Sequence, residues 1–77
     1  IPNPIVNESI ISFEDKAINE DLIIQITNMY GQICLQESFR YSFDHVISKK
    51  DYEPGIYTAT VLNSRGYFNQ LRFIIIN

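Results

Sequence analysis

The sequence predicts an all-β fold, a small antiparallel β-sandwich of about six or seven short strands. Three observations support this fold. Apolar residues alternate with a period of two, turn residues separate the alternating runs at short spacing, and no window has an apolar stripe at helical spacing. At 77 residues the chain has room for a single domain. We expect an extended lead-in over residues 1–8 and the sandwich over residues 9–77.

Residues 22–27 and 56–61 show the strand pattern most clearly. Both runs alternate between two faces and are rich in β-branched residues. Shorter runs of the same kind cover residues 9–13, 32–38 and 41–47. The lead-in before them is expected to be extended, because Pro2 and Pro4 have no backbone N–H and Asn3 precedes a proline.

The last run covers residues 71–76. Leu71, Phe73 and Ile75 share one face, and Arg72, Ile74 and Ile76 share the other. Because both faces become apolar toward the end, we expect a strand buried on both faces, as a central strand is. The apolar segment 73–76 would aggregate from an unprotected edge, so we expect it to be paired on both sides or held by a partner. Strand exchange between two copies is one form such pairing takes.

The three glycines mark turns. Asn28 and Gly31 are the first and fourth residues of one turn, and the segment 63–66 repeats this spacing and ends at Gly66. Asn hydrogen-bonds the backbone two residues on and Gly accepts a left-handed conformation, so both segments predict hairpins with a type I turn and a bulge. Pro54-Gly55 predicts a type II turn.

The composition argues against several function classes. The formal net charge is −3 at pH 7, and a nucleic-acid-binding domain would need a basic surface instead. No apolar run approaches the roughly 20 residues that span a bilayer. The first residue is Ile1 rather than Met, so we expect this sequence to be part of a longer chain. A single Cys excludes an internal disulfide.

Cys34 and His45 are the only candidates for a nucleophile and a base. Cys34 lies between Ile33 and Leu35, and we expect an inert thiol in apolar surroundings. His45 lies in a polar stretch, and nothing in the sequence indicates a third orienting group or an oxyanion hole. We therefore expect no enzymatic activity and no cofactor.

Two further polar motifs are weak. The acidic loop contains Glu14, Asp15, Asn19, Glu20 and Asp21, but their spacing matches no calcium-binding loop, and solvated acids are the preferred interpretation. Asn7-Glu8-Ser9 fits the N-glycosylation pattern, which is frequent by chance.

The aromatic residues fall in or beside the predicted strands, and we expect them to form the sandwich core with Tyr hydroxyls reaching the surface. Tyr67 and Phe68 follow a turn and are the pair expected to be exposed. The aromatics considered are Phe13, Phe39, Tyr41, Phe43, Tyr52, Tyr57, Tyr67, Phe68 and Phe73.

Four motifs occur in order along the chain. They are Pro2-Asn3-Pro4, the strand and turn of residues 26–34 with Asn28 and Gly31, the strand start Pro54-Gly55-Ile56-Tyr57, and Arg72 before the apolar residues Phe73, Ile74, Ile75 and Ile76. Together they resemble the C-terminal sorting domain, of type A, of Bacteroidota proteins exported by the type IX (Por) secretion system. Asn28 stands where this family usually has Asp.

This resemblance implies an immunoglobulin-like β-sandwich behind a larger secreted cargo. Such a domain directs cargo from the periplasm through the outer membrane to the cell surface or medium, and a sortase-like peptidase usually removes it, here in the segment before Ser9. The implied partners are the secretion machinery, that peptidase and the covalently attached cargo. Arg72 and the residues to Ile76 are the candidates for contact with the translocon, and Asn28, Gly31, Pro54, Gly55, Tyr57 and Gly66 are expected to shape turns.

One alternative stays open from the residues alone. A fibronectin-like or carbohydrate-binding accessory sandwich of a secreted protein would have the same composition and strand pattern. In that case the exposed pair Tyr67 and Phe68 would carry the binding.

Overall fold

A computed structural model of the chain describes residues 8–66 and 68–76, with only the backbone of Phe68. Within these residues the strands are β1 (Glu8–Glu14), β2 (Leu22–Asn28), β3 (Ile33–Phe39), β4 (Ser42–Ser48), β5 (Gly55–Leu62) and β6 (Phe68–Ile75). The all-β prediction is confirmed, and each predicted run lies in one strand with small differences at its ends. In the described part of the chain, no helix has the length and apolar character to cross a membrane.

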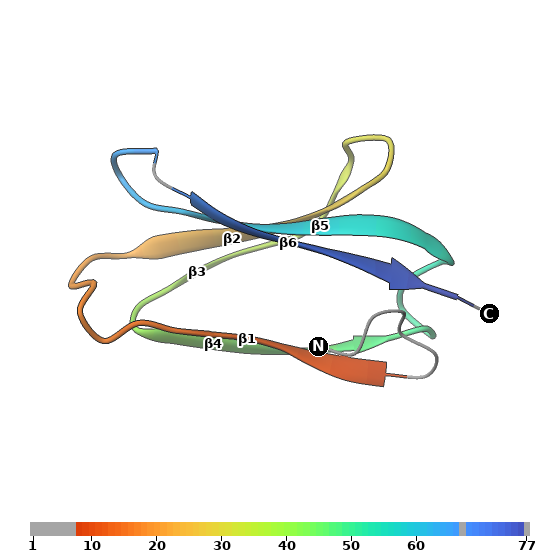
Figure 1. Ribbon diagram of the computed structural model, residues 1–77, viewed down its shortest axis with the longest axis horizontal. Helices are drawn as coiled ribbons and strands as arrows, with labels where there is room; N and C mark the ends of the chain where they lie inside the picture. Colours follow the sequence, from red (N-terminus) through yellow and green to blue (C-terminus); the bar gives the residue numbers. More distant parts are fainter. Residues whose placement is uncertain (1–7, 67, 77) are drawn as a thin grey trace.

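The strands form two antiparallel sheets. A four-stranded sheet has the order β3-β2-β5-β6, and a two-stranded sheet pairs β1 with β4. Figure 1 shows the two sheets as stacked layers, with β3 descending from the upper layer to join β4 in the lower one. The two sheets therefore form a small β-sandwich, as predicted.

The core lies between the two layers and follows the period of two in the sequence. In β2, Leu22, Ile24 and Ile26 are at most 1% exposed, whereas Ile23 between them is 40% exposed. Ile24 and Ile26 belong to one core cluster, to which the opposite layer contributes Ile11, Phe43 and Ile47. Burial of such side chains stabilises the fold by about 1.5–3 kcal/mol each. The remaining buried hydrophobic members of the cluster are Tyr52, Tyr57, Ala59, Phe73 and Ile75.

The aromatic side chains form a continuous series of ring contacts through this core. The series runs in the order Phe13, Phe39, Phe43, His45, Tyr52, Tyr57, Phe73. Because it begins on β1 and ends on β6, it connects the two layers. The expectation of an aromatic core is confirmed for Phe43, Tyr52, Tyr57 and Phe73, with Phe39 packed against them, but is wrong for Tyr41, which is 40% exposed. Tyr41 lies in the β3–β4 turn at a φ of 71°, and its hydroxyl donates to Asn19 Oδ1 at 2.8 Å.

The β2–β3 turn has the predicted chemistry. Asn28 Oδ1 accepts hydrogen bonds from the backbone N–H groups of Tyr30 at 2.9 Å and Gln32 at 3.0 Å. The backbone N–H of Gly31 donates to the Asn28 carbonyl at 3.1 Å, and Gly31 has a φ of +80°. The register of β2 and β3 shifts between Ile26 and Thr27, as expected for a bulge.

The β5–β6 turn follows the same pattern, with the backbone N–H of Arg65 donating to Asn63 Oδ1 at 2.9 Å and Gly66 at a φ of +82°. The prediction of a type II turn at Pro54-Gly55 is wrong. Gly55 has a φ of +156°, far from the value near +80° that a type II turn requires, because it already belongs to strand β5.

Candidate recognition surface

Strand β6 lies at the edge of the four-stranded sheet, where β5 is its partner in the described topology. Its inward residues Phe73 and Ile75 are 0% and 1% exposed, whereas Ile74 and Ile76 are 37% and 39% exposed. The prediction of a strand buried on both faces is therefore wrong. No described element covers the outer face of this sheet, so the apolar residues on that face remain in contact with solvent.

Phe73 anchors β6 to the rest of the domain. Its ring stacks on Tyr57 with centroids 5.5 Å apart and planes 12° from parallel. The Tyr57 hydroxyl in turn donates to the Glu53 carbonyl at 2.6 Å, which ties the start of β5 to the preceding loop. Burial raises the pKa of Tyr57, with smaller contributions from Cys34 and Glu53, so the hydroxyl stays protonated and acts as a donor.

Thr27 points to the outer face of the sheet, because its neighbour Ile26 points into the core. Arg72 points to the same face, since it lies opposite Thr58 and Thr58 lies opposite Thr27. Among the described outward strand residues of this sheet, Arg72 is the sole charged side chain. These residues are Ile23, Gln25 and Thr27 of β2, Ile33, Gln36 and Ser38 of β3, Ile56, Thr58, Thr60 and Leu62 of β5, and Gln70, Arg72 and Ile74 of β6.

A row of neutral polar side chains crosses the middle of this face. Gln25 Nε2 donates to Gln36 Oε1 at 2.8 Å, and Gln70 Nε2 donates to Thr60 Oγ1 at 3.4 Å. The register aligns all four residues across the four strands. The first bond joins two side-chain amides and the second joins an amide to a hydroxyl. The middle of the face is therefore polar and uncharged.

Cys34 is exposed, so the expectation of a thiol in apolar surroundings is wrong. It lies on the edge strand β3 at the bulge, where neighbouring strands do not cover it. His45 is half-buried, and its Nε2 lies 3.1 Å from the Tyr52 hydroxyl. Burial is also the main cause that raises the pKa of Tyr52. The described contacts thus join His45 to a core tyrosine.

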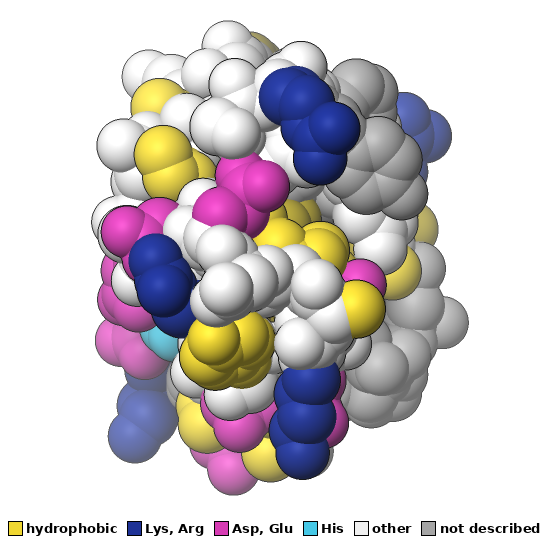
Figure 2. All heavy atoms as spheres, turned by 90° about the vertical axis from the view of Figure 1, so that its left-hand side faces the viewer, with side chains coloured by type: hydrophobic (Ala, Val, Ile, Leu, Met, Phe, Trp, Pro, Cys, Tyr) yellow, Lys and Arg dark blue, Asp and Glu magenta, His cyan; other side chains and the backbone are white. Residues whose placement is uncertain are grey.

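The acidic loop is bound to protein donors. Glu20 Oε1 accepts from the backbone N–H of Ser64 at 3.1 Å and from its hydroxyl at 2.8 Å, and these two bonds are the main causes that lower the pKa of Glu20. Asp21 Oδ1 accepts from Arg40 Nε at 3.1 Å. In Figure 2, which looks at this end, acidic and basic side chains are interspersed. Residues 8–66 and 68–76 contain no group of three or more His, Cys, Asp or Glu side chains able to hold a metal ion.

Several predicted positions lie outside the described residues. They are the boundary motif Pro2, Asn3 and Pro4, the glycosylation position Asn7, and the side chains of Tyr67 and Phe68. Conversely, Met29, Tyr30 and Ile56 are exposed although the sequence pattern did not indicate them as contact residues. Of these three, only the exposure of Ile56 could have been predicted from the sequence. Ile56 lies two residues before Thr58 in β5, so the two side chains point to the same face of the sheet.

Comparison with known proteins agrees with the motif resemblance. A family model described as the secretion system C-terminal sorting domain matches residues 1–77, which is the whole sequence. Comparisons with curated proteins and with solved structures gave no significant match. The chain therefore belongs to the family of type IX secretion system C-terminal sorting domains.

Proposed function

We propose that residues 1–77 act as one sorting domain that directs an attached cargo from the periplasm through the outer membrane by the type IX system. Membership of the sorting-domain family supports this function. The observation that carries the residue assignment is the alternating exposure of residues 72–76, at and just beyond the end of β6. Arg72, Ile74 and Ile76 are exposed, whereas Phe73 and Ile75 are buried.

This alternation divides the last strand into two roles. Phe73 and Ile75 hold the strand in the core, and their burial gives it a defined position. Arg72, Ile74 and Ile76 contact the translocon from the outer face. Arg72 supplies a positive charge, and the two isoleucines supply apolar area that contact with a partner would bury.

The N-terminal end has a separate role in this proposal. The sortase-like peptidase cuts in the segment before Ser9, next to the boundary motif Pro2, Asn3 and Pro4, and the cargo then stays at the cell surface or enters the medium. The domain itself contributes recognition and no catalysis. Cys34, the residue most open to nucleophilic chemistry, has no acid–base partner among the described hydrogen bonds.

A fusion experiment tests the proposal. Residues 1–77 are joined behind a fluorescent protein that carries a Sec signal, in a host with a type IX system, and fluorescence at the surface and in the medium is measured. Combining Arg72→Gln, Ile74→Ser and Ile76→Ser should lower export about tenfold while the core stays intact. The matched control combines Ile10→Ser and Val46→Ser, which are 54% and 50% exposed on the other sheet.

Export of the triple variant at the level of the unmodified fusion would contradict the proposal. Thermal unfolding of the purified variants, followed by circular dichroism, separates a recognition defect from a folding defect. An accessory binding domain would give a different result, namely export that is independent of residues 72–76 and a glycan affinity that falls on Tyr67→Ala.

A further inference from the structure

One end of the outer face of the four-stranded sheet gathers exposed apolar side chains from segments that are distant in the sequence. We name this group the apolar end. Its members come from the β2–β3 turn, the start of β3, the start of β5 and the end of β6. They are Met29, Tyr30, Ile33, Ile56, Ile74 and Ile76, which are 55%, 80%, 56%, 43%, 37% and 39% exposed.

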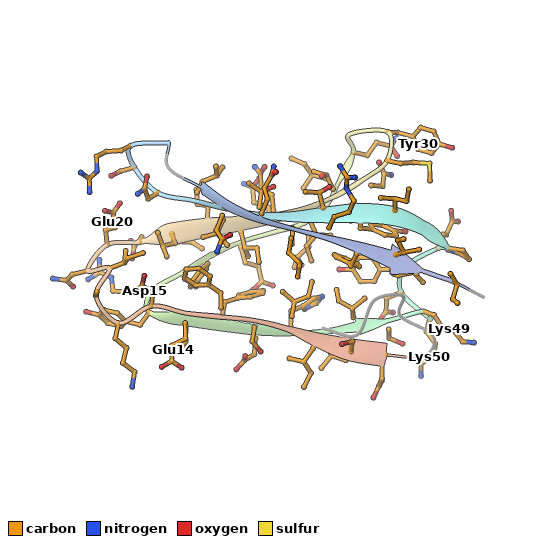
Figure 3. All side chains as sticks on the ribbon, in the orientation of Figure 1. Glu14, Asp15, Glu20, Tyr30, Lys49 and Lys50 are labelled. Atoms are coloured by element: carbon orange, nitrogen blue, oxygen red, sulfur yellow. The ribbon has the colours of Figure 1, made fainter. Side chains whose placement is uncertain are left out.

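The register brings these residues together. Ile56 lies directly opposite Ile74, and both point outward. The Met29 methyl group lies 3.3 Å from the position that a Cβ would occupy on Gly55, so the β2–β3 turn packs over the start of β5. A shallow recess of about 130 Å³ lies there and is lined by both segments, with Glu53 of the loop before β5 as the acidic residue in its lining. Figure 3 shows Tyr30 on the turn that projects outward from the sheet at this end.

The charge beside the apolar end specifies the partner. The row that adjoins Ile56 and Ile74 runs across the four strands as Ile33, Thr27, Thr58 and Arg72. Arg72 is the sole charge among the described outward strand residues. An apolar surface with one cation at its border is complementary to an apolar surface with a carboxylate at the matching place.

The same charge argues against two other occupants. A second copy packed face to face, with the two-fold axis near Arg72, would bring two like charges together. An anionic membrane is attracted by clusters of basic residues, whereas this face has one arginine and the chain has a net charge of −3.

We propose that the apolar end and Arg72 form a single docking surface for an apolar, carboxylate-bearing protein surface of the secretion machinery. This inference rests on the proposed function and extends it. The machinery then recognises the folded domain, because Met29, Tyr30 and Ile56 join the surface only when β2, β5 and β6 are paired. A linear signal confined to the last strand would not include them.

The fusion assay with substitutions far from β6 in the sequence tests this inference. We expect Ile56→Glu, and separately Met29→Ser combined with Tyr30→Ser, to lower export about fivefold or more. Ile23→Glu is the matched control, because Ile23 is 40% exposed on the same face outside the apolar end. It should export within about twofold of the unmodified fusion. Met29 and Tyr30 are exposed turn residues, so their replacement leaves the core intact.

The outcomes separate this inference from the proposed function. If the β6 triple variant loses export while the Ile56 and Met29–Tyr30 variants keep it, the composite surface is wrong and the last strand alone is recognised. If the triple variant keeps export, the proposed function itself fails. In addition, Arg72→Glu should lower export further than Arg72→Gln, because it places like charges together. Equal losses of export in the two variants would contradict the inference that the partner surface carries a carboxylate.

Discussion

The outer faces of the two sheets differ in charge although their inner faces are alike. On the two-stranded sheet, the described outward positions include the acids Glu8, Glu14 and Asp44 and no basic residue. On the four-stranded sheet they include Arg72 and no acid. Both inner faces carry Ile and Phe side chains of one core cluster. The inner faces therefore account for the stability of the fold, and the outer faces distinguish one side of the domain from the other.

This difference also orients the domain. A partner surface with a carboxylate is attracted to the face with Arg72 and repelled by the face with three acids. The acidic face has exposed apolar residues too, Ile10 and Val46, so apolar character alone does not distinguish the faces. Charge is what separates them.

The largest expected effect tests whether the inner faces share one core. Phe73→Ala on the four-stranded sheet should destabilise the fold by about 3–5 kcal/mol, and Ile47→Ala on the two-stranded sheet by about 2–5 kcal/mol. Both side chains are 0% exposed, so each substitution leaves a cavity. Urea-induced unfolding of the 77-residue chain measures both. A loss below about 1 kcal/mol in only one of them would mean that the two layers do not depend on a common core.

A pair of glycines provides a sharper test of the apolar end. Gly31 and Gly66 have φ values of +80° and +82°, and a Cβ at either position meets no atom within 4 Å. Gly31→Ala and Gly66→Ala should each cost about 1–2 kcal/mol, because the left-handed conformation is strained for Ala. Only Gly31 belongs to the turn that carries Tyr30. We therefore expect equal losses in thermal stability but a larger loss of export for Gly31→Ala, and equal export would count against a role for that turn.

Removal of the acidic face should have a smaller effect. Glu8→Gln, Glu14→Gln and Asp44→Asn together should change the free energy of unfolding by at most about 0.5 kcal/mol, since these side chains are exposed. Export should stay within about twofold of the unmodified fusion, because we propose that the machinery contacts the other face. A strong loss of export would show that the machinery recognises these acids. The face of the two-stranded sheet, and not the face with Arg72, would then be the one that contacts the machinery.

The smallest effect concerns Glu20, which is half-buried and caps the β5–β6 turn through Ser64. Its pKa is lowered in the fold from the ordinary value of 4.5, so the stabilisation is present above that value and is lost as the pH falls through the lowered folded value. Glu20→Gln should therefore lower the melting temperature slightly near neutral pH and not in strong acid. A difference that persists at low pH would mean that the carboxylate charge is not responsible.

The local features of the fold follow from the amino-acid sequence. Side chains alternate across a strand with a period of two, so the inward residues of β2 could be assigned from their order alone. The turn at Asn28 and Gly31 was predictable because its hydrogen bonds join residues at most four positions apart. The ordered motifs were also sufficient to indicate the sorting-domain family, which the family match over residues 1–77 confirms.

Which strands lie beside one another became known only from the folded structure. The order of strands in a sheet depends on pairing between segments that are distant in the sequence. The alternation of apolar and polar residues along a strand shows which face is buried but not which strand lies next to it. For this reason the edge position of β6, the exposure of Cys34 at the bulge of β3, and the engagement of Glu20 by Ser64 were not predictable from local pattern. The apolar end was not predictable from local pattern either, since Met29, Ile56 and Ile74 become neighbours only when β2, β5 and β6 pair in register.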